Sequence, residues 1–340
     1  MNRFRKRLSV ARHRVAGVML LVLLTMFSSV AIAADTVSIA TFNCEFLVHK
    51  KVHIKFGYPF TLRGADKTLW EQPGYRDARF LEATRAVAAA IRTLDADLIA
   101  LTEVGDAADV ELLRNEIASL GLTYPHVFVG DSTDNTTGQH VAVLSRRPLL
   151  QTLDRIPGRE GYYEELDDPD TENDTGVSKG LHVVFNVNGS IPVHLIVAHL
   201  ASERGGHEQD RQRVAQASLV RRFYLPFLDA GEHVIVAGDL NDGRGQPALQ
   251  RIRGFDDIHG DLIQTGHHRF SDDTELGERW TYRFRGERNQ IDHVLISRSI
   301  YEACGKRNVV PEFFPTTGTI ANTGRPVSDH RALSLTLTFP

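Results

Sequence analysis

The chain has 340 residues, of which 42% are hydrophobic and 24% charged, and its formal net charge at pH 7 is −4. After the first 33 residues it has no long apolar run, no Pro/Ser-rich linker and no internal repeat, which favours one large domain over two. An acidic chain does not attract polyanions over its whole surface, so nucleic-acid binding would depend on local Arg clusters and a bound cation.

The first 33 residues have the composition of a secretory signal peptide. Six basic residues accompany an apolar stretch from Val15 to about Phe27, and a small-residue motif ends at Ala33. The apolar stretch is short for a membrane span, which needs about twenty residues. We therefore expect cleavage near Ala33 or Ala34 rather than a membrane anchor. Six of the 39 basic residues lie in this segment, so the exported remainder, with 43 acidic residues, would carry a net charge near −10.

Seven short apolar segments are typical of buried strands, and two longer segments have helical periodicity. The predicted strands span residues 38–45, 98–103, 141–145, 181–187, 194–199, 234–237 and 290–296, and the predicted helices span 79–94 and 209–228. Strands alternate with helices in some places and meet as hairpins in others. This order favours mixed sheets over purely parallel ones.

Two polar segments interrupt this pattern. Residues 47–78 mix basic and aromatic side chains such as Lys55, Phe56 and Trp70 in an irregular stretch. They could grip a nucleic acid, rest on a membrane, or form a surface loop whose aromatics fold back on the core. The acidic residues 164–174 fit no calcium-binding spacing, so we expect a solvated loop there.

Several predicted strands end in residues that can bind a metal or move a proton. The set comprises Asn43, Glu103, His199, Asp239 with Asn241, Asp292, and the C-terminal motif Ser328-Asp329-His330. Phosphodiester hydrolysis needs a cation to offset charge on the phosphoryl oxygens, a positioned water, and a way to release the leaving oxygen. Six strand ends that converge on one cleft could supply these functions.

In this order, the segments resemble the endonuclease/exonuclease/phosphatase family, the DNase I-like phosphoesterases that include abasic-site endonucleases, bacterial sphingomyelinases and inositol polyphosphate phosphatases. The resemblance covers roughly residues 36–340. It implies an α/β (α+β) fold of four layers, in which helices flank two packed mixed β-sheets. The active site is then expected at one end of the sheets, within a single catalytic domain over residues 34–340.

The resemblance also implies a role for each residue. Asn43, Glu103 and Asp329 match positions that bind or orient Mg²⁺ or Mn²⁺. His330, polarised by Asp292, matches the principal acid/base or phosphate-contacting histidine. Asp239 would orient or deprotonate the attacking water.

Two further positions contact the phosphoryl group by the same resemblance. Asn241 would hydrogen-bond a phosphoryl oxygen, and His199 would contact a non-bridging one. Abasic-site endonucleases have tyrosine at the position of His199, which counts against a repair role, as does export. By strand alternation, His293 is expected on the opposite face, in a structural role.

Residues Trp280-Thr281-Tyr282-Arg283 resemble a segment of exported bacterial nuclease-like members. Arg283 or Arg285 could bind phosphate there, or the segment could be an aromatic hairpin that packs on the core. Cys44 and Cys304 are expected to be buried free thiols, with Cys44 pointing away from the site, and a disulfide between them is the alternative.

The sequence thus predicts an exported, divalent-metal-dependent phosphodiesterase, periplasmic or extracellular, most simply a monomeric nuclease acting on DNA or RNA without a lasting membrane anchor. A sphingomyelinase-like phospholipase C on the same catalytic set is the nearest alternative. A non-catalytic binding protein on this fold is a more remote one. The sequence leaves the substrate open, because loops around a shared catalytic end select the ester.

Overall fold

The computed structural model describes residues 34–163, 172–254, 260–265, 278–315 and 318–340. The chain from Ala34 to Pro340 forms one compact unit. The predicted signal peptide and residues 164–171 of the acidic segment lie outside the described residues. Among the helices in the described ranges, none has the length and hydropathy required to span a membrane.

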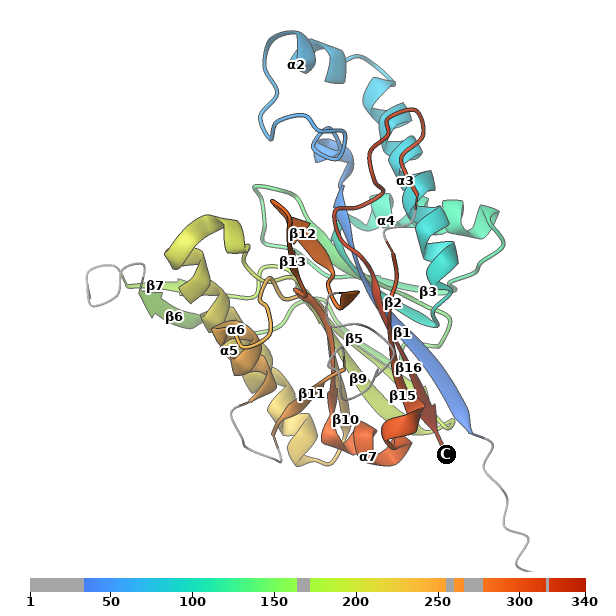
Figure 1. Ribbon diagram of the computed structural model, residues 1–340, viewed down its shortest axis with the longest axis vertical. Coiled ribbons are helices and arrows are strands. Elements are labelled where there is room, and N and C mark those ends of the chain that lie inside the picture. The colour runs from blue at the N-terminus through green and yellow to red at the C-terminus, as the bar shows by residue number, and fades with distance from the viewer. Residues whose placement is uncertain (1–33, 164–171, 255–259, 266–277, 316–317) are drawn as a thin grey trace, which may run out of the picture. The chain divides into compact units, whose positions relative to one another are not determined.

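Two six-stranded mixed sheets form the centre of this unit (Figure 1). The first sheet has the order β15 (Val309–Phe313), β16 (Leu333–Phe339), β1 (Asp35–Leu47), β2 (Leu98–Val104), β4 (His140–Ser145), β3 (His126–Val129). The second has the order β11 (Leu262–Gln264), β14 (Asp292–Ser297), β10 (His233–Asp239), β9 (Ile191–Ala198), β8 (Gly180–Val187), β5 (Gln151–Leu153). In each sheet one central pair is parallel, β1 with β2 and β9 with β10, and the other pairs are antiparallel.

Helices cover the outer faces of both sheets and complete four layers. One side carries α3 (Tyr75–Leu94) and α4 (Ala107–Ser119), and the other carries α5 (Gly206–Asp229) and α6 (Pro247–Arg253). One apolar cluster fills the space between the sheets, and two others lie between each sheet and its helices. The central strands are buried on both faces, which is why they read as apolar runs in the sequence. The predicted four-layer sandwich is confirmed.

The remaining elements are short. They are α2 (Gly64–Trp70), α7 (Arg298–Cys304), the hairpin of β6 (Glu160–Tyr163) with β7 (Glu172–Thr175), the hairpin of β12 (Tyr282–Phe284) with β13 (Glu287–Asn289), and 3₁₀ turns at His49–Lys51, Glu203–Gly205 and Lys306–Asn308. In Figure 1 the β12–β13 hairpin stands at the opposite end of the sheets from α7 and the C-terminus.

The seven predicted strands and both predicted helices are present, but two polar segments differ from expectation. The stretch 47–78 is not irregular throughout, because it contains α2 and the start of α3. Its aromatics do fold back: Trp70 is 1% exposed and packs edge-on against Tyr58. In the acidic segment, residues 172–175 form β7 instead of a solvated loop, since they pair with β6.

Both cysteines are buried free thiols, as predicted. Cys44 belongs to the cluster between the first sheet and α3, on the side away from the site. Cys304 lies in the cluster between the sheets. Burial raises the pKa of Cys44 to about 12 and that of Cys304 to about 11, so neither is a nucleophile at neutral pH.

Candidate active site

Strand direction explains why distant parts of the sequence meet at one end of the sandwich. β1, β2, β9 and β10 finish at this end, and β14 and β16, antiparallel to their neighbours, begin there. Four strands therefore deliver their last residues to the site, and two deliver the residues at or just before their start. The predicted residues brought together are Asn43, Glu103, His199, Asp239, Asp292 and His330.

Local backbone irregularities aim these side chains. Pairing of β1 with β2 shifts register after Asn43, and β2 with β4 shifts after Thr102, which marks bulges at both strand ends. Glu103 and Asn241 have positive φ values of 56° and 50°, unusual for residues other than glycine. Such strain is retained where the surrounding structure enforces it, often at functional sites.

Gly238 is required by close backbone approach. Its φ is +134°, and a Cβ atom there would lie 2.0 Å from the carbonyl oxygen of Ala198. The absence of a side chain lets β10 approach the end of β9. Asp239 and His199 can then face the same space.

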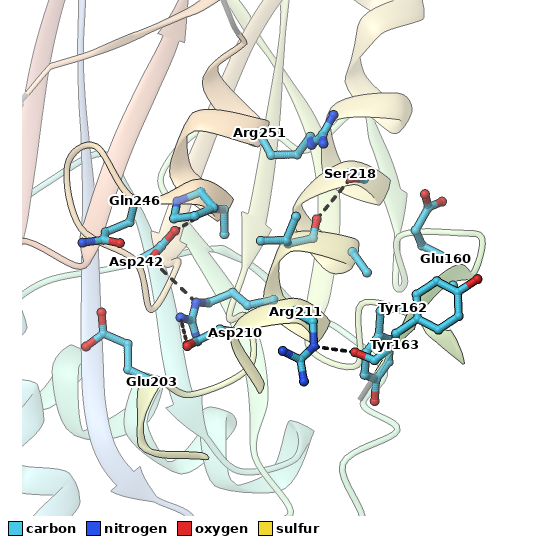
Figure 2. Close-up of a pocket in the computed structure, with 16 residues that line it drawn as sticks. Glu160, Tyr162, Tyr163, Glu203, Asp210, Arg211, Ser218, Asp242, Gln246 and Arg251 are labelled. Atoms are coloured by element: carbon cyan, nitrogen blue, oxygen red, sulfur yellow. Dashed lines mark hydrogen bonds and ion pairs between the residues drawn. The ribbon is translucent and has the colours of Figure 1, made fainter. Parts of the chain in front are cut away.

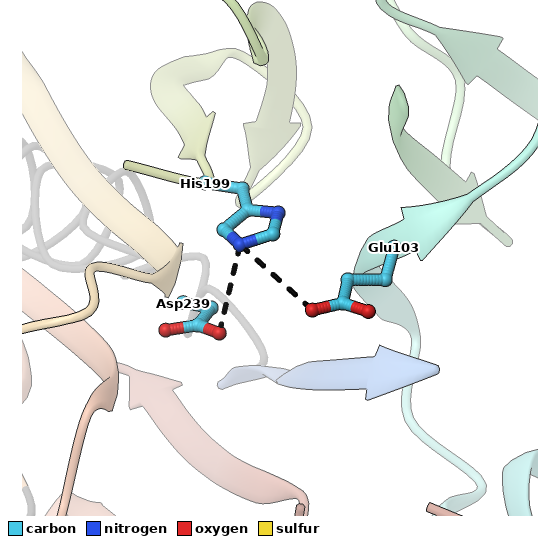
Figure 3. A group of neighbouring side chains, drawn as sticks. All are labelled: Glu103, His199 and Asp239. Atoms are coloured by element: carbon cyan, nitrogen blue, oxygen red, sulfur yellow. Dashed lines mark ion pairs between the residues drawn. The ribbon is translucent and has the colours of Figure 1, made fainter. Parts of the chain in front are cut away.

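The Asn43 amide joins two carboxylates. Its Nδ2 donates to Glu103 Oε1 over 3.1 Å and to Asp239 Oδ2 over 2.8 Å. His199 closes the group, with Nε2 lying 4.0 Å from Glu103 Oε1 and 3.8 Å from Asp239 Oδ2 (Figure 3). One buried polar cluster therefore contains residues from the ends of β1, β2 and β10, together with His199, which directly follows β9.

His330 and Asp292 form a charged pair beside this cluster. Nδ1 of His330 lies 2.7 Å from Oδ2 of Asp292, and its Nε2 lies 3.9 Å from Asp239 Oδ2. Burial alone would lower the pKa of His330, but the charge and hydrogen bond of Asp292, with Asp239 and Asp329, raise it well above its ordinary value. His330 is therefore an imidazolium that presents Nε2–H toward the cluster.

His199, in contrast, is uncharged. Burial, with the positive charges of Lys179 and His330 nearby, lowers its pKa well below the ordinary value. The site thus holds one charged and one neutral histidine. Burial, followed by the charge of Asp292, raises the pKa of Asp239 to about 7, despite the opposing charge of His330.

The donor set fits a divalent cation. Glu103, His199 and Asp239, and likewise Asp239, Asp292 and His330, each offer ligand atoms that lie within 4.8 Å of one another. Burial and the negative charge of Asp329 raise the pKa of Glu103, a conflict that a cation would relieve. Carboxylate oxygens are ligands of Mg²⁺ and Mn²⁺.

The predicted metal residues occupy different places in this arrangement. Glu103 lies at the centre of the cluster. Asp329 is at its rim, with a side chain 38% exposed and Oδ1 3.9 Å from His330 Nε2. Asn43 turns its Nδ2 toward the carboxylates, and its Oδ1 accepts a hydrogen bond from the Glu45 N–H.

The other predicted residues lie at the edges. Asn241 is buried and its side chain donates to the Leu200 carbonyl. Arg283 and Arg285 are exposed on the β12–β13 hairpin. His293 turns away, with Nε2 2.9 Å from the Asp242 carbonyl oxygen, in keeping with the structural role expected for it.

Sequence reasoning missed three residues that support the site. Lys55 is fully buried and donates to the Cys44 and Val327 carbonyls, so it is no surface contact for nucleic acid or membrane. The ring of Tyr282 packs on His330 with centroids 4.7 Å apart. Arg204 donates to the Tyr282 hydroxyl. The sequence indicated Tyr282 as part of the segment around Trp280 and Lys55 as part of the stretch 47–78, but it gave no indication of Arg204.

A separate cavity of about 620 Å³ lies between β6, α5 and the start of α6 (Figure 2). The lining residues that the structure describes include none of those predicted for the site. Two of its carboxylates pair with Arg213: Arg213 Nη2 lies 2.7 Å from Asp210 Oδ1, and Arg213 Nε lies 3.8 Å from Asp242 Oδ1. Asp242 also caps α6 by accepting from Ala248 N over 2.6 Å.

Fold and site together are those of a metal-dependent phosphodiester hydrolase. The Endonuclease/Exonuclease/phosphatase family model matches residues 40–330, and the chain belongs to this family.

Comparisons with individual proteins agree with the family. The chain is 25% identical over 296 residues to sphingomyelin phosphodiesterase 2 of Mus musculus, covering 84% of this chain. It spans 67% of that protein's length and 56% of the length of the human protein of the same name.

Among solved structures, D. rerio TDP2 complexed with single strand DNA product matches with a TM-score of 0.55 at 16% identity, over 88% of this chain and 98% of that one. Sphingomyelinase C from Streptomyces griseocarneus matches with a TM-score of 0.50 at 20% identity, over 89% and 99% of the two chains. These likenesses concern the fold.

Proposed function

We propose that this chain is an exported, divalent-metal-dependent phosphodiesterase whose substrate is nucleic acid. The observation that carries the proposal is the buried cluster in which Asn43 joins Glu103 and Asp239 next to the His330–Asp292 pair. The imidazolium of His330 and the neutral ring of His199 lie 3.9 Å and 3.8 Å from the buried Asp239 carboxylate, an arrangement that suits attack of water on a phosphodiester.

In this mechanism, His330 Nε2–H donates to a phosphoryl oxygen and stabilises the charge that develops there. Asp239 accepts a proton from the attacking water, and its pKa of about 7 matches that task at neutral pH. His199, neutral and buried, adds a hydrogen bond to the phosphoryl group. Asp292 holds His330 in its charged form and orientation.

A divalent cation, when bound, supplies positive charge that offsets the phosphoryl oxygens. Glu103 would hold it, with Asp329 across the rim. Asn43 keeps the Glu103 carboxylate in position by its hydrogen bond. The Phe46 N–H, which donates to Glu103 Oε2 over 2.9 Å, fixes the second oxygen.

Positive side chains near the site favour a polyanionic substrate. Arg204, Arg283 and Arg285 are exposed on this part of the molecule, although the chain as a whole carries a net charge of −4. Local positive charge is what a phosphate backbone requires. The fold is also compatible with such a substrate, since TDP2 of D. rerio has been crystallised with a single-strand DNA product.

A choline phospholipid is the second candidate, because the sequence relatives include sphingomyelin phosphodiesterase 2 of mouse. An enzyme that acts at a membrane surface needs a contiguous apolar patch. Among the exposed large apolar side chains in the described ranges, Phe284, at 43% exposed, is on the hairpin beside the site. Others, such as Leu150 at 54% and Val310 at 52%, lie on different parts of the chain. We therefore favour nucleic acid.

The test is hydrolysis of plasmid DNA, single-stranded DNA, RNA and sphingomyelin vesicles by the purified protein with Mg²⁺ or Mn²⁺. The His330→Ala variant serves as the blank, and His126→Ala, which changes a histidine on β3 far along the sheet, is the matched control. Cleavage of nucleic acid by the wild type and His126→Ala but not by His330→Ala supports the proposal. Lipid hydrolysis alone would assign the second candidate, and cleavage that survives His330→Ala would overturn the mechanism.

Export and a monomeric state complete the proposal, on the basis of the basic and apolar first 33 residues and the single compact unit that follows. N-terminal sequencing of the protein recovered outside the cytoplasm should show that the chain begins near Ala34. Light scattering on the same material should give the mass of one chain.

A further inference from the structure

A row of adjacent aromatic rings extends outward from His330. Tyr282 lies against the His330 ring, with centroids 4.7 Å apart. Phe284 stacks on Tyr282 with centroids 6.4 Å apart and planes inclined by 10°. Tyr282 is 8% exposed, whereas Phe284 is 43% exposed. The row therefore begins at the catalytic histidine and ends at the surface.

The hairpin that carries these rings is tied to the site. Arg331 N donates to the Thr281 carbonyl over 2.6 Å, next to His330 in the chain. Thr281 Oγ1 accepts over 3.0 Å from the backbone N–H of Asp292, the partner of His330. The hairpin turns through Arg285 and Gly286, both at positive φ, as the tight type I′ turn requires. The row is thus held in a fixed position relative to the reacting groups.

Arg204 runs along one side of this row. Its guanidinium lies 5.9 Å from the Tyr282 centroid and 5.1 Å from the Phe284 centroid, and it donates to the Tyr282 hydroxyl. Burial would lower the pKa of Arg204, but the Tyr282 hydroxyl and the charges of Asp329 and Glu103 raise it. Arg204 is therefore a permanent positive charge between the carboxylate cluster and the exposed ring.

The row thus places aromatic ring faces next to guanidinium groups. One class of phosphodiester matches both features. A single-stranded nucleic acid has a planar base beside each phosphate, and bases stack on aromatic side chains. In a duplex, the faces of each base are covered by its neighbours, so they cannot occupy such a row. A choline headgroup binds aromatic faces through its positive charge. Here the guanidinium groups of Arg204 and Arg285 already lie over the Phe284 ring, both at 5.1 Å, and would repel a second cation.

We infer that Tyr282, Phe284 and Arg204 form a subsite for a single-stranded segment next to the scissile phosphate. One base stacks on Phe284, and Arg204 binds the adjoining phosphate. Arg285, which lies over the Phe284 ring at 5.1 Å on the exposed turn, is the side chain that the base displaces.

The first test separates stacking from apolar contact by exchanging Phe284 for Leu, Ala or Trp. Steady-state kinetics are measured on a single-stranded oligonucleotide and on an abasic strand of equal length. Stacking predicts that Phe284→Leu and Phe284→Ala raise KM for the oligonucleotide about tenfold with kcat unchanged. It also predicts that Phe284→Trp resembles the wild type and that no variant alters KM for the abasic strand. Leu150→Ala, at an exposed apolar residue 54% accessible outside this hairpin, is the control.

The second test concerns Arg204. Replacing Arg204 by Gln should make the dependence of log KM on log salt concentration less steep by about 0.7, the value for one phosphate contact in a single strand. Arg204→Lys, which keeps the charge, should retain the slope of the wild type. An unchanged slope in Arg204→Gln would contradict the phosphate contact.

Because the inference rests on the proposed function, the experiments must distinguish a wrong function from a wrong subsite. Wild-type protein that cleaves no nucleic acid with Mg²⁺ or Mn²⁺ overturns the proposed function. Wild-type protein that cleaves single strands, with a KM insensitive to Phe284→Leu, overturns this inference alone. A Phe284→Leu variant that behaves as wild type while Phe284→Ala is impaired, most of all on lipid vesicles, would instead assign the ring to membrane contact.

Discussion

Among the three carboxylates that raise the pKa of His330, Asp292 has the largest effect. Asp292 Oδ2 lies 2.7 Å from His330 Nδ1, while burial of the ring acts in the opposite direction on its pKa. Asp292→Asn keeps the shape of the partner but removes its negative charge. The pKa of His330 must then fall, because only the weaker effects of Asp239 and Asp329 still oppose that of burial.

We expect Asp292→Asn to lower kcat about 100-fold, since the positive charge at Nε2 is lost over most of the working range. As the pH rises, the residual activity of the variant should be lost at a lower pH than the activity of the wild type, because His330 of the variant releases its proton at a lower pH. The pH profile of kcat measures this shift. A profile that keeps the wild-type alkaline limb would show that Asp292 does not set the charge of His330.

Gly238 offers a second prediction at this scale, on stability. A methyl group there meets the Ala198 carbonyl oxygen at 2.0 Å and the backbone is at φ +134°, so Gly238→Ala should cost about 3 kcal/mol of unfolding free energy. Gly189 is the matched control: its φ is also positive, at +75°, but nothing lies within 4 Å of an added Cβ. Gly189→Ala should cost only about 1 kcal/mol. Urea denaturation of both variants measures the difference, and equal losses would contradict the steric argument.

At the scale of elements, the sequence predicts what local pattern encodes. Strands such as β10 are buried on both faces, so the run Val234–Ala237 is apolar and easily recognised. The α2 helix was missed because its seven residues, GADKTLW, carry no repeating apolar face. β7 was missed because its residues ENDT are all polar and the first three are exposed, and they are a strand only through pairing with β6.

The same distinction between local pattern and long-range contact applies to the residues of the site. Residues at strand ends could be found from the sequence, because each follows or begins an apolar run. The contact of Arg204 with Tyr282 joins residues 78 apart, and that of Lys55 with Val327 joins residues 272 apart. No local pattern encodes such contacts. Lys55 even suggested the wrong environment, since a lysine among polar residues is usually exposed.

Lys55 ties the end of β1 to the loop before His330. Its Nζ is fully buried, donates to the Cys44 carbonyl over 2.8 Å and also binds the Val327 carbonyl. Glu45 Oε2 lies 3.8 Å away, and burial raises the pKa of Glu45 to about 7 in spite of this positive neighbour. One ammonium group therefore satisfies carbonyls from two segments of the active-site end.

Lys55→Met should cost about 3 to 5 kcal/mol, because it leaves the buried Cys44 and Val327 carbonyls without this donor and removes one of the positive neighbours of Glu45. Chemical denaturation at pH 7 measures the loss. Lys51→Met, at a nearby lysine that lies over the Phe60 ring and is only partly buried, is the control and should cost under about 1 kcal/mol. Similar losses in both variants would contradict the role of Lys55 as a tie.

For the whole molecule, buried titratable groups make stability depend on pH in two opposing ways. Carboxyl groups with raised pKa values, such as Asp239 and Glu45, favour the folded state as pH falls. Buried neutral histidines have the opposite effect. The pH dependence of the unfolding free energy of the wild type therefore combines both effects. The contribution of one residue is obtained as the difference between the wild type and a variant that lacks this residue.

His182 is suited to such a measurement. It lies 5% exposed between β8 and α5, with Nε2 2.9 Å from His194 Nδ1 and its ring stacked on Phe227. Burial, with a smaller effect of His194, lowers its pKa to about 4. Between pH 4 and about 6.5 the unfolded chain binds a proton at this residue that the folded chain does not, so its contribution to stability is present above pH 6.5 and is lost as pH falls toward 4.

His182→Gln removes this titration and leaves the carboxyl groups near the active site in place. The unfolding free energy of the wild type relative to His182→Gln should therefore decrease by about 3 kcal/mol between pH 7 and pH 4, because the pKa of His182 is lowered from 6.5 to about 4. Urea denaturation of both proteins over this range gives the difference directly, with His207→Gln, at a side chain 94% exposed, as the control. A difference that stays constant with pH would mean that His182 is protonated in the folded protein. The stack with Phe227 would then have to accommodate a cation, as aromatic faces can.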